Sequence, residues 1–240
     1  ILEQFDFDFS LVFPPELDAG GLADKYDVII FPDGAIPGVR GGVGRGGGRS
    51  GSPDPESIPA EYRDRLGSVS AQTTVPQLRE FLEAGGTIIT LEGSTNLGYH
   101  LGLPITNHLV DSEGTPLRSE EFFVPGSLLE VAERDEGWVT TGMADTYIVN
   151  FARSPVFSVD DGATGIRVLA EYASEAPLRS GWAWGQEKLE SGAALIEAEV
   201  GEGTLYLFGP QITYRGQTHE TFPLVFNGIL LSAARETSLR

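Results

Sequence analysis

The stretch YDVIIFPDG at residues 26–34 decides the fold class. A short run of β-branched residues that ends in Pro-Asp-Gly is typical of a buried parallel strand leading into a loop. Residues 87–91, TIITL, form a second run of this kind. Between the two runs, residues 74–84 carry apolar side chains at helical spacing. Strands that alternate with helices predict an α/β fold with a parallel sheet.

The helix predicted at 74–84 has clear end signals. Thr74 is the expected N-cap, and Gln77, three residues later, completes a capping box. A glycine pair then stops the helix, because glycine readily adopts the left-handed conformation found after a last helical turn. The second strand ends at a turn over residues 92–96, and we expect a short helix at 97–101.

Strands dominate the prediction for the rest of the chain. The runs at 193–198 and 204–208 flank Val-Gly-Glu-Gly, which predicts a β-hairpin. A helix with apolar residues at i, i+4 and i+8 is expected at 222–234. The other predicted strands are 7–13, 122–124, 147–149 and 167–170.

A glycine-rich segment at residues 38–52 contains eight glycines and three arginines. It has no large apolar side chain with which to order itself, so we expect a mobile loop. It lacks the lysine and the Ser/Thr of a phosphate-binding P-loop. The alternative is a flap that contacts a peptide or an anion through Arg40, Arg45 and Arg49.

Composition excludes several classes of function. The formal net charge is −19 with a pI near 4.4, which leaves little basic surface for binding nucleic acid. The absence of cysteine excludes thiolate catalysis, disulfides and cysteine-ligated zinc. No apolar run approaches the ~20 residues of a membrane span, so no membrane insertion is expected. The start at Ile1 shows no signal-peptide pattern, and we expect the sequence to be part of a longer chain.

Several segments together resemble the class I glutamine amidotransferase-like fold. The resemblance is to the version found C-terminal to the catalytic domain of bacterial secreted M14-type zinc carboxypeptidases. The segments that carry it are 26–34, 85–94, FVPGSLL at 123–129, SPVF at 154–157, SGW at 180–182, 203–211 and RGQTHETF at 215–222.

This resemblance implies a flavodoxin-like three-layer sandwich with a mostly parallel central sheet. Extra antiparallel strands are expected in the C-terminal half, within β-rich additions at about 118–200, and one domain is expected to span residues 1–240. The resemblance also implies a non-catalytic accessory domain, extracellular or periplasmic, whose partner is a peptidase domain of the same polypeptide. Zinc would belong to that separate domain, and no cofactor is expected here.

The catalytic positions of the family are vacant in this sequence. In active members a cysteine occupies the sharp turn after the second strand, where Glu92 stands here. The partner histidine and glutamate correspond to Gly209 and Gln211. Three losses together imply that the amidotransferase chemistry is gone. A carboxylate at position 92 would lie near backbone N–H donors, which predicts a lowered pKa.

Ser94 is the alternative nucleophile. It lies on a strand-to-helix turn, where serine hydrolases expose their reactive hydroxyl, although the Gly-x-Ser-x-Gly pattern is not met. The competing interpretation is that Ser94 or Thr95 caps the following helix by accepting its free N–H groups.

The histidines and tryptophans offer further candidates. His100, His108 and His219 lack the close spacings of a zinc site, and the group His108, Asp111 and Glu113 lies in a predicted loop, so no metal site is expected. Trp182 and Trp184, with Trp138 and Tyr214, are candidates for a sugar- or peptide-binding groove. Trp182 and Trp184 would face the same side of a strand. The alternatives are core packing or a domain interface.

Overall fold

The computed structural model describes residues 1–39 and 53–231, and the predicted loop at 38–52 lies almost wholly outside this range. The helices are α1 Pro14–Asp18, α2 Thr74–Glu83, α3 Asn96–Leu101 and α4 Phe222–Leu231. The strands are β1 Val28–Phe31, β2 Thr87–Leu91, β3 Ile105–Asn107, β4 Ser127–Glu133, β5 Thr146–Phe151, β6 Phe157–Val159, β7 Ile166–Glu171, β8 Leu178–Ser180, β9 Ala193–Val200 and β10 Gly203–Phe208.

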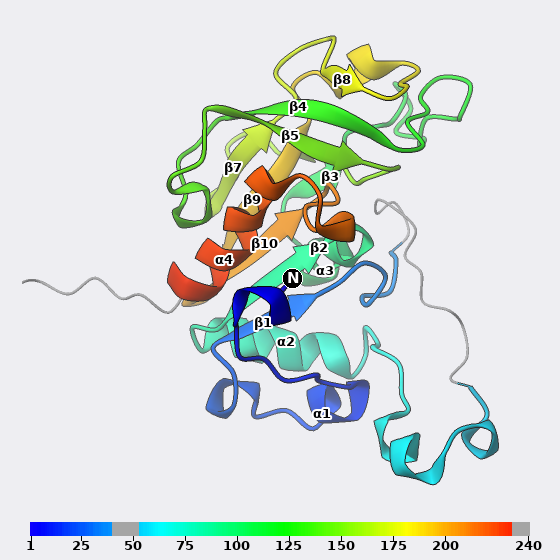
Figure 1. Cartoon of the computed structure of the whole chain (residues 1–240), viewed down its shortest axis with the longest axis vertical. Helices are drawn as coiled ribbons and strands as arrows, with labels where there is room; N and C mark the ends of the chain where they lie inside the picture. Colours follow the sequence, from blue (N-terminus) through cyan, green and yellow to red (C-terminus); the bar gives the residue numbers. More distant parts are fainter. Residues whose placement is uncertain (40–52, 232–240) are drawn as a thin grey trace, which may run out of the picture.

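One mixed ten-stranded sheet runs through the molecule (Figure 1). Its main order is β1-β2-β10-β9-β7-β4-β5, with β3, β6 and β8 attached to the sides. Among the described residues, parallel pairing is confined to β1 with β2 and β2 with β10. The expectation of a mostly parallel sheet is therefore wrong. The reason lies in the β9–β10 hairpin, which reverses the chain direction and places antiparallel strands beyond it.

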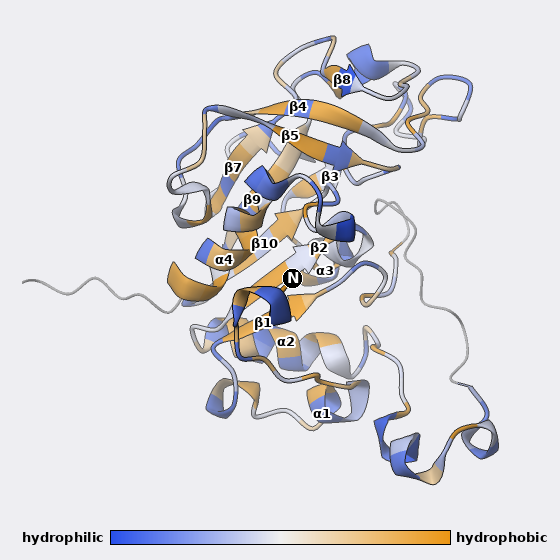
Figure 2. Cartoon of the chain, in the orientation of Figure 1, coloured by the Kyte–Doolittle hydropathy of each residue, from blue (hydrophilic) through white to orange (hydrophobic). Residues whose placement is uncertain are grey.

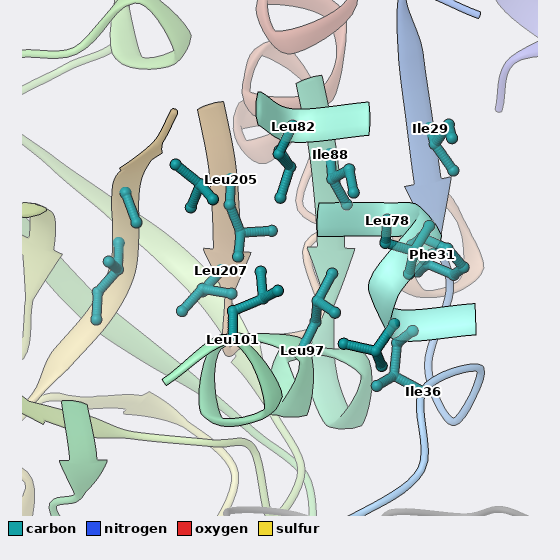
Figure 3. Close-up of a cluster of buried hydrophobic side chains, with 14 of the residues drawn as sticks. Ile29, Phe31, Ile36, Leu78, Leu82, Ile88, Leu97, Leu101, Leu205 and Leu207 are labelled. Atoms are coloured by element: carbon teal, nitrogen blue, oxygen red, sulfur yellow. The ribbon is translucent and has the colours of Figure 1, made fainter. Parts of the chain in front are cut away.

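Helices cover both faces of the parallel part of the sheet, which gives three layers. Because side chains alternate along a strand, neighbouring residues of β2 enter different cores. Ile88 joins the cluster formed with α1, α2 and α3, whereas Ile89 joins the cluster formed with α4. Figure 3 shows the first cluster, in which Leu78 and Leu82 of α2 lie against Ile88. The expected α/β sandwich is confirmed for this part of the fold.

The two central parallel strands are almost wholly buried, whereas β1 at the edge alternates between half-buried and buried residues. All five residues of β2 are buried, and Figure 2 shows apolar colour concentrated in the central strands while polar residues gather in the connections. The carboxyl ends of β1, β2 and β10 consequently meet at one edge of the sheet. Polar side chains that follow these strands are brought together at this edge. In open α/β sheets, binding sites form at the same place, beyond the carboxyl ends of the strands.

Several local predictions are wrong. Residues 7–13 and 122–124 form no strand, although Phe123 makes an isolated bridge with Trp184. The Thr74 hydroxyl donates to Asp18 Oδ1 at 2.5 Å, and the N-cap Thr73 makes no side-chain capping bond, so the capping box is absent. Strand β4, which lies between β7 and β5, was not predicted. None of the helices in the described ranges has the length and apolar character needed to cross a membrane.

Candidate functional site

The sharp turn after β2 resembles the backbone of a nucleophile elbow. Glu92 has φ of +50°, in the left-handed region that non-glycine residues seldom occupy. A 3₁₀ turn at Glu92–Thr95 leads directly into α3. In hydrolases, a strained strand-to-helix turn of this kind holds the reactive side chain out of the backbone. Here the residue at its apex is a glutamate.

Glu92 is held by Gln211, another position that the resemblance matches to a catalytic residue. Gln211, just beyond β10, donates a hydrogen bond from Nε2 to Glu92 Oε2 at 2.8 Å. The backbone N–H of Gln211 also donates to the Asn150 carbonyl at 2.8 Å, which fixes the chain on which the side chain stands. Two of the three positions thus contact each other, as their places at adjacent strand ends predict.

Asp33 completes the polar cluster and takes the backbone donor at the elbow. The N–H of Gly93 donates to Asp33 Oδ1 at 2.9 Å. In α/β-hydrolases the N–H of the residue after the nucleophile belongs to the oxyanion hole. At this elbow that donor already binds a carboxylate, and a second negative charge at the same N–H would be repelled.

The pKa of Glu92 is raised, contrary to the expectation of a lowered value. Burial raises it most, the hydrogen bond from Gln211 lowers it, and the nearby charge of Asp33 raises it further. The expectation failed because burial of the Glu92 side chain outweighs the hydrogen bond that it accepts, while the Gly93 N–H donates to Asp33.

This shift predicts how a Glu92→Gln variant changes stability with pH. A raised pKa means that the folded protein holds a proton that the unfolded chain has released, so ionisation of Glu92 lowers stability as pH rises above about 4.3. Glutamine keeps an acceptor oxygen for Gln211 and carries no charge. We expect the free energy of unfolding of the variant, relative to the wild type, to increase from pH 4.5 to pH 7. Urea denaturation at both pH values measures this difference, and a decrease would contradict the raised pKa.

Gly209, which the resemblance matches to the family's histidine, has no room for a side chain. A Cβ placed on Gly209 would overlap the backbone carbonyl oxygen of Pro155 and lie 3.2 Å from that of Ala194. The Gly209 N–H also donates to the Ala194 carbonyl at 3.0 Å, so this backbone is fixed. A histidine at this position would therefore clash with the surrounding backbone.

Ser94 is a structural clamp in this geometry. Its side chain is fully buried, and its Oγ donates to the Pro32 carbonyl while accepting from the N–H groups of Ala35 and Ile36 at 3.0 and 3.3 Å. Thr95 Oγ1 donates to the Glu92 carbonyl at 2.6 Å. Neither side chain caps the helix as expected, because both bind backbone groups outside it. Ser94 instead ties the loop after β1 to the elbow.

The three histidines lie in separate surroundings. His100 Nε2 contacts the Pro37 carbonyl at 2.8 Å, and His108 Nδ1 contacts Ser158 Oγ at 2.9 Å. Burial lowers the pKa of His108, although backbone hydrogen bonds partly oppose this. The ring of His219 packs against Phe222 at 5.1 Å. None of the three is a hydrogen-bond partner of Ser94 within the described residues.

The loop around His108 does not gather its acidic residues into a metal site. Asp111 Oδ1 accepts from the backbone N–H groups of Glu113 and Thr115, both at 2.9 Å, and so serves to fold the loop. In residues 1–39 and 53–231, no group of three or more His, Cys, Asp or Glu side chains is arranged to hold a metal ion.

An aromatic surface lies away from the elbow. Trp182 and Trp184 are 52% and 55% exposed, so neither packs in the core. They follow β8 and lie outside regular strands. Trp182 meets Phe123 edge to face at 5.9 Å, and the Arg153 guanidinium lies over the Phe123 ring, 5.3 Å from its centroid. Trp138 and Tyr214 are also exposed.

A cleft adjoins this aromatic surface. It has a volume of about 220 Å³, and Phe123 and Arg153 belong to both the cleft and the surface. Trp184 is fixed by a hydrogen bond from its indole Nε1 to the Glu120 carbonyl at 2.8 Å. Exposed aromatic rings next to an arginine are the residue types that dominate protein-binding surfaces.

Comparison with known proteins identifies the scaffold. No protein-family model matches the chain, and no curated protein sequence matches it. A protein from Thermoplasma acidophilum described as a putative GMP synthase subunit superposes with a TM-score of 0.51 at 9% identity, over 97% of this chain and 84% of that chain. A cytoplasmic protein from Salmonella typhimurium gives 0.50 at 12% identity, over 96% and 83%.

A third solved structure matches only a small part of a larger protein. The β-galactosidase from Bacillus circulans sp. alkalophilus gives a TM-score of 0.45 at 16% identity, over 85% of this chain and 22% of that chain. The chain therefore spans about a fifth of that enzyme's length. At these identities the likeness shows the fold alone, which is an α/β, glutamine amidotransferase-like fold.

Proposed function

We propose that this chain is a non-catalytic interaction domain built on an amidotransferase-like scaffold. The observation that carries the proposal is the hydrogen bond from the Gly93 N–H to Asp33, because it fills the oxyanion-binding donor with a carboxylate. The contact between Gln211 and Glu92 and the closed space at Gly209 support it. With nucleophile, base and oxyanion donor all lost, the elbow serves to hold three strand ends together.

The partner that we propose is a zinc carboxypeptidase domain of the M14 type in the same polypeptide, in a bacterial protein of the cell exterior or periplasm. The support is the resemblance carried by segments such as 123–129, 180–182 and 215–222. In the structure, segments 123–129 and 180–182 lie together, since Ser127 Oγ donates to the Trp182 carbonyl at 2.6 Å. These segments form part of the aromatic surface, which we take as the candidate interface.

A serine hydrolase using Ser94 is the less favoured alternative, because the Oγ proton is donated to a backbone carbonyl. A sugar- or peptide-binding module is the second candidate, and the half-exposed rings of Trp182 and Trp184 favour it. Quenching of tryptophan fluorescence by a ligand, lost in Trp182→Ala, would support the module. Unchanged fluorescence over a panel of oligosaccharides and peptides would leave the interface as the better explanation.

Activity measurements on the protein test the proposed loss of catalysis. We expect no release of glutamate from glutamine and no hydrolysis of p-nitrophenyl acetate above the level of the Glu92→Gln variant. That variant changes the elbow and keeps the surrounding contacts, so it is a matched control. A glutaminase or esterase rate that saturates with substrate and falls in the variant would overturn the proposal.

A further inference from the structure

Strand β1 leaves one edge of the sheet open. The Asp27 carbonyl accepts from the Thr87 N–H at 3.0 Å, and β1 then pairs with β2 in parallel register. Because bonding direction alternates along a strand, the N–H and C=O groups of Val28 and Ile30 point away from β2. Within residues 1–39 and 53–231, these outward groups have no hydrogen-bond partner.

The opposite edge of the sheet is closed by the chain itself. At β5 the N–H of Gln211 donates to the Asn150 carbonyl at 2.8 Å, and the N–H of Ile148 donates to Glu220 Oε1 at 3.1 Å. Proteins normally protect strand edges, since unpaired backbone groups are templates for another strand. The outward backbone groups of β1 therefore lack, in the part of the chain that the structure describes, the hydrogen-bond partners that those of β5 have.

A groove of about 1030 Å³ lies along this open edge. Its lining includes every residue of β1 and all of residues 7–12. The segment 7–12 crosses the edge without pairing to it (Figure 1). Phe7 stacks on Phe226 at 5.0 Å on the α4 side, and Val12 packs into the core on the α1 side.

The groove has a defined chemistry. Its walls are mainly apolar, and the exposed carboxylates of Asp8 and Asp27 lie at its rim. The one lysine in the lining, Lys25, is already paired with Glu16 at 3.3 Å. An occupant therefore needs backbone groups to meet Val28 and Ile30, apolar side chains for the walls, and positive charge for the rim.

We infer that β1 binds an extended segment of a partner polypeptide, which joins the sheet as an added strand with alternating apolar residues and basic flanks. In such strand addition, main-chain hydrogen bonds supply affinity and side-chain contacts supply specificity. This inference specifies a contact of the interaction role proposed above and rests on that role. The added strand would pair with β1 and would use none of the positions Glu92, Gly209 and Gln211.

Amide hydrogen exchange tests whether the edge is open. In the free protein we expect the Val28 and Ile30 amides to exchange at least about tenfold faster than those of Ile29 and Phe31, which face β2. Protection at every protein concentration would mean that residues 7–12 close the edge as a strand. Protection that grows with concentration, together with a dimer in sedimentation, would mean that a second copy is the occupant. Both outcomes overturn the inference.

A probe peptide tests occupancy directly. The probe is an acetylated and amidated heptapeptide of sequence KVTVTVK, and an acidic version, EVTVTVE, is its matched control. We expect the basic peptide to slow exchange at Val28 and Ile30 at least about tenfold at millimolar concentration, and the acidic peptide to have a smaller effect. Equal protection by both peptides would overturn the inferred charge preference. Protection by neither peptide would overturn the site itself.

Two variants locate the binding. Ile30→Pro removes an outward N–H that β2 does not use, and proline is tolerated on edge strands in that orientation. We expect it to abolish peptide binding and also to lower thermal stability, because the Ile30 side chain packs against the core cluster formed with α4, whereas Trp182→Ala should bind as the wild type does. Asp27→Asn keeps the strand intact and should weaken binding of the basic peptide but not of the acidic one. This variant supplies a second readout if Ile30→Pro misfolds. Loss of binding in Trp182→Ala alone would move the site to the aromatic surface. The activity assays on the elbow are unaffected by these outcomes, so the two proposals can fail separately.

Discussion

Replacing Ser94 with alanine is expected to lower the free energy of unfolding by about 2–4 kcal/mol, because three backbone groups lose their partner at once. The Pro32 carbonyl and the N–H groups of Ala35 and Ile36 all bind Ser94 Oγ. Ile36 is fully buried, so water cannot easily replace the lost bond there. A loss of this size is a large part of the free energy of unfolding of a typical domain, which is ~5–15 kcal/mol.

Thermal unfolding measures the effect. A loss of this size in a chain of 240 residues corresponds to a decrease in Tm of about 5–15 °C. The matched control is Ser112→Ala, which changes an exposed loop serine and should shift Tm by less than about 2 °C. If Ser94→Ala unfolded like the control, Ser94 would not be a clamp, and its burial in the elbow would need another explanation.

The second large effect is expected from Gly209→Ala, which should cost about 3 kcal/mol or more. The added methyl group meets the backbone carbonyl oxygen of Pro155, and a backbone atom cannot rotate away as a side chain can. The hydrogen bond from the Gly209 N–H to Ala194 prevents a simple shift of the chain. Gly209→His, which would introduce the histidine that the resemblance implies at this position, is expected to be at least as harmful.

Gly126→Ala is the control for this prediction. Gly126 is exposed, its φ is not positive, and a methyl group placed there meets no atom within 4 Å. We expect a change of no more than about 0.5 kcal/mol in urea denaturation. A mild effect of Gly209→Ala, similar to that of Gly126→Ala, would show that the space for a catalytic histidine has not closed.

The strongest sequence signals lay in the parallel strands. β1 and β2 are predicted because each is a compact β-branched run, and the β9–β10 hairpin is predicted because two runs flank Val-Gly-Glu-Gly. Strand β4, SLLEVAE, was missed, since its leucines, alanine and glutamates favour a helix as much as a strand. Its strand conformation depends on pairing with β5 and β7, whose residues are distant in sequence.

The wrong strand at 7–13 has a similar cause. Its alternating phenylalanines favour a strand. In the structure, Phe7 instead packs by stacking on Phe226, more than two hundred residues away in the sequence. The side chains therefore hold the segment beside β1 without any ladder of hydrogen bonds.

The candidate site was predicted in part. The resemblance placed Glu92, Gly209 and Gln211 at strand ends, and two of them meet in the structure. The role of Asp33 was missed because Pro-Asp-Gly is typical of a turn. Its carboxylate binds Gly93 across 60 residues of sequence, a contact that local pattern cannot reveal. The predicted lowering of the Glu92 pKa is wrong because burial, which the local sequence does not reveal, raises this pKa most.

We conclude that the turn at Glu92–Thr95 has the backbone shape of an elbow and lacks an activated nucleophile. Covalent labelling tests it most directly, because a fluorophosphonate reacts with a serine only when a base and an oxyanion site activate it. We predict that the intact mass of the protein stays unchanged after incubation with a fluorophosphonate. A stoichiometric adduct that maps to Ser94, and that is absent from folded Ser94→Ala, would contradict the account.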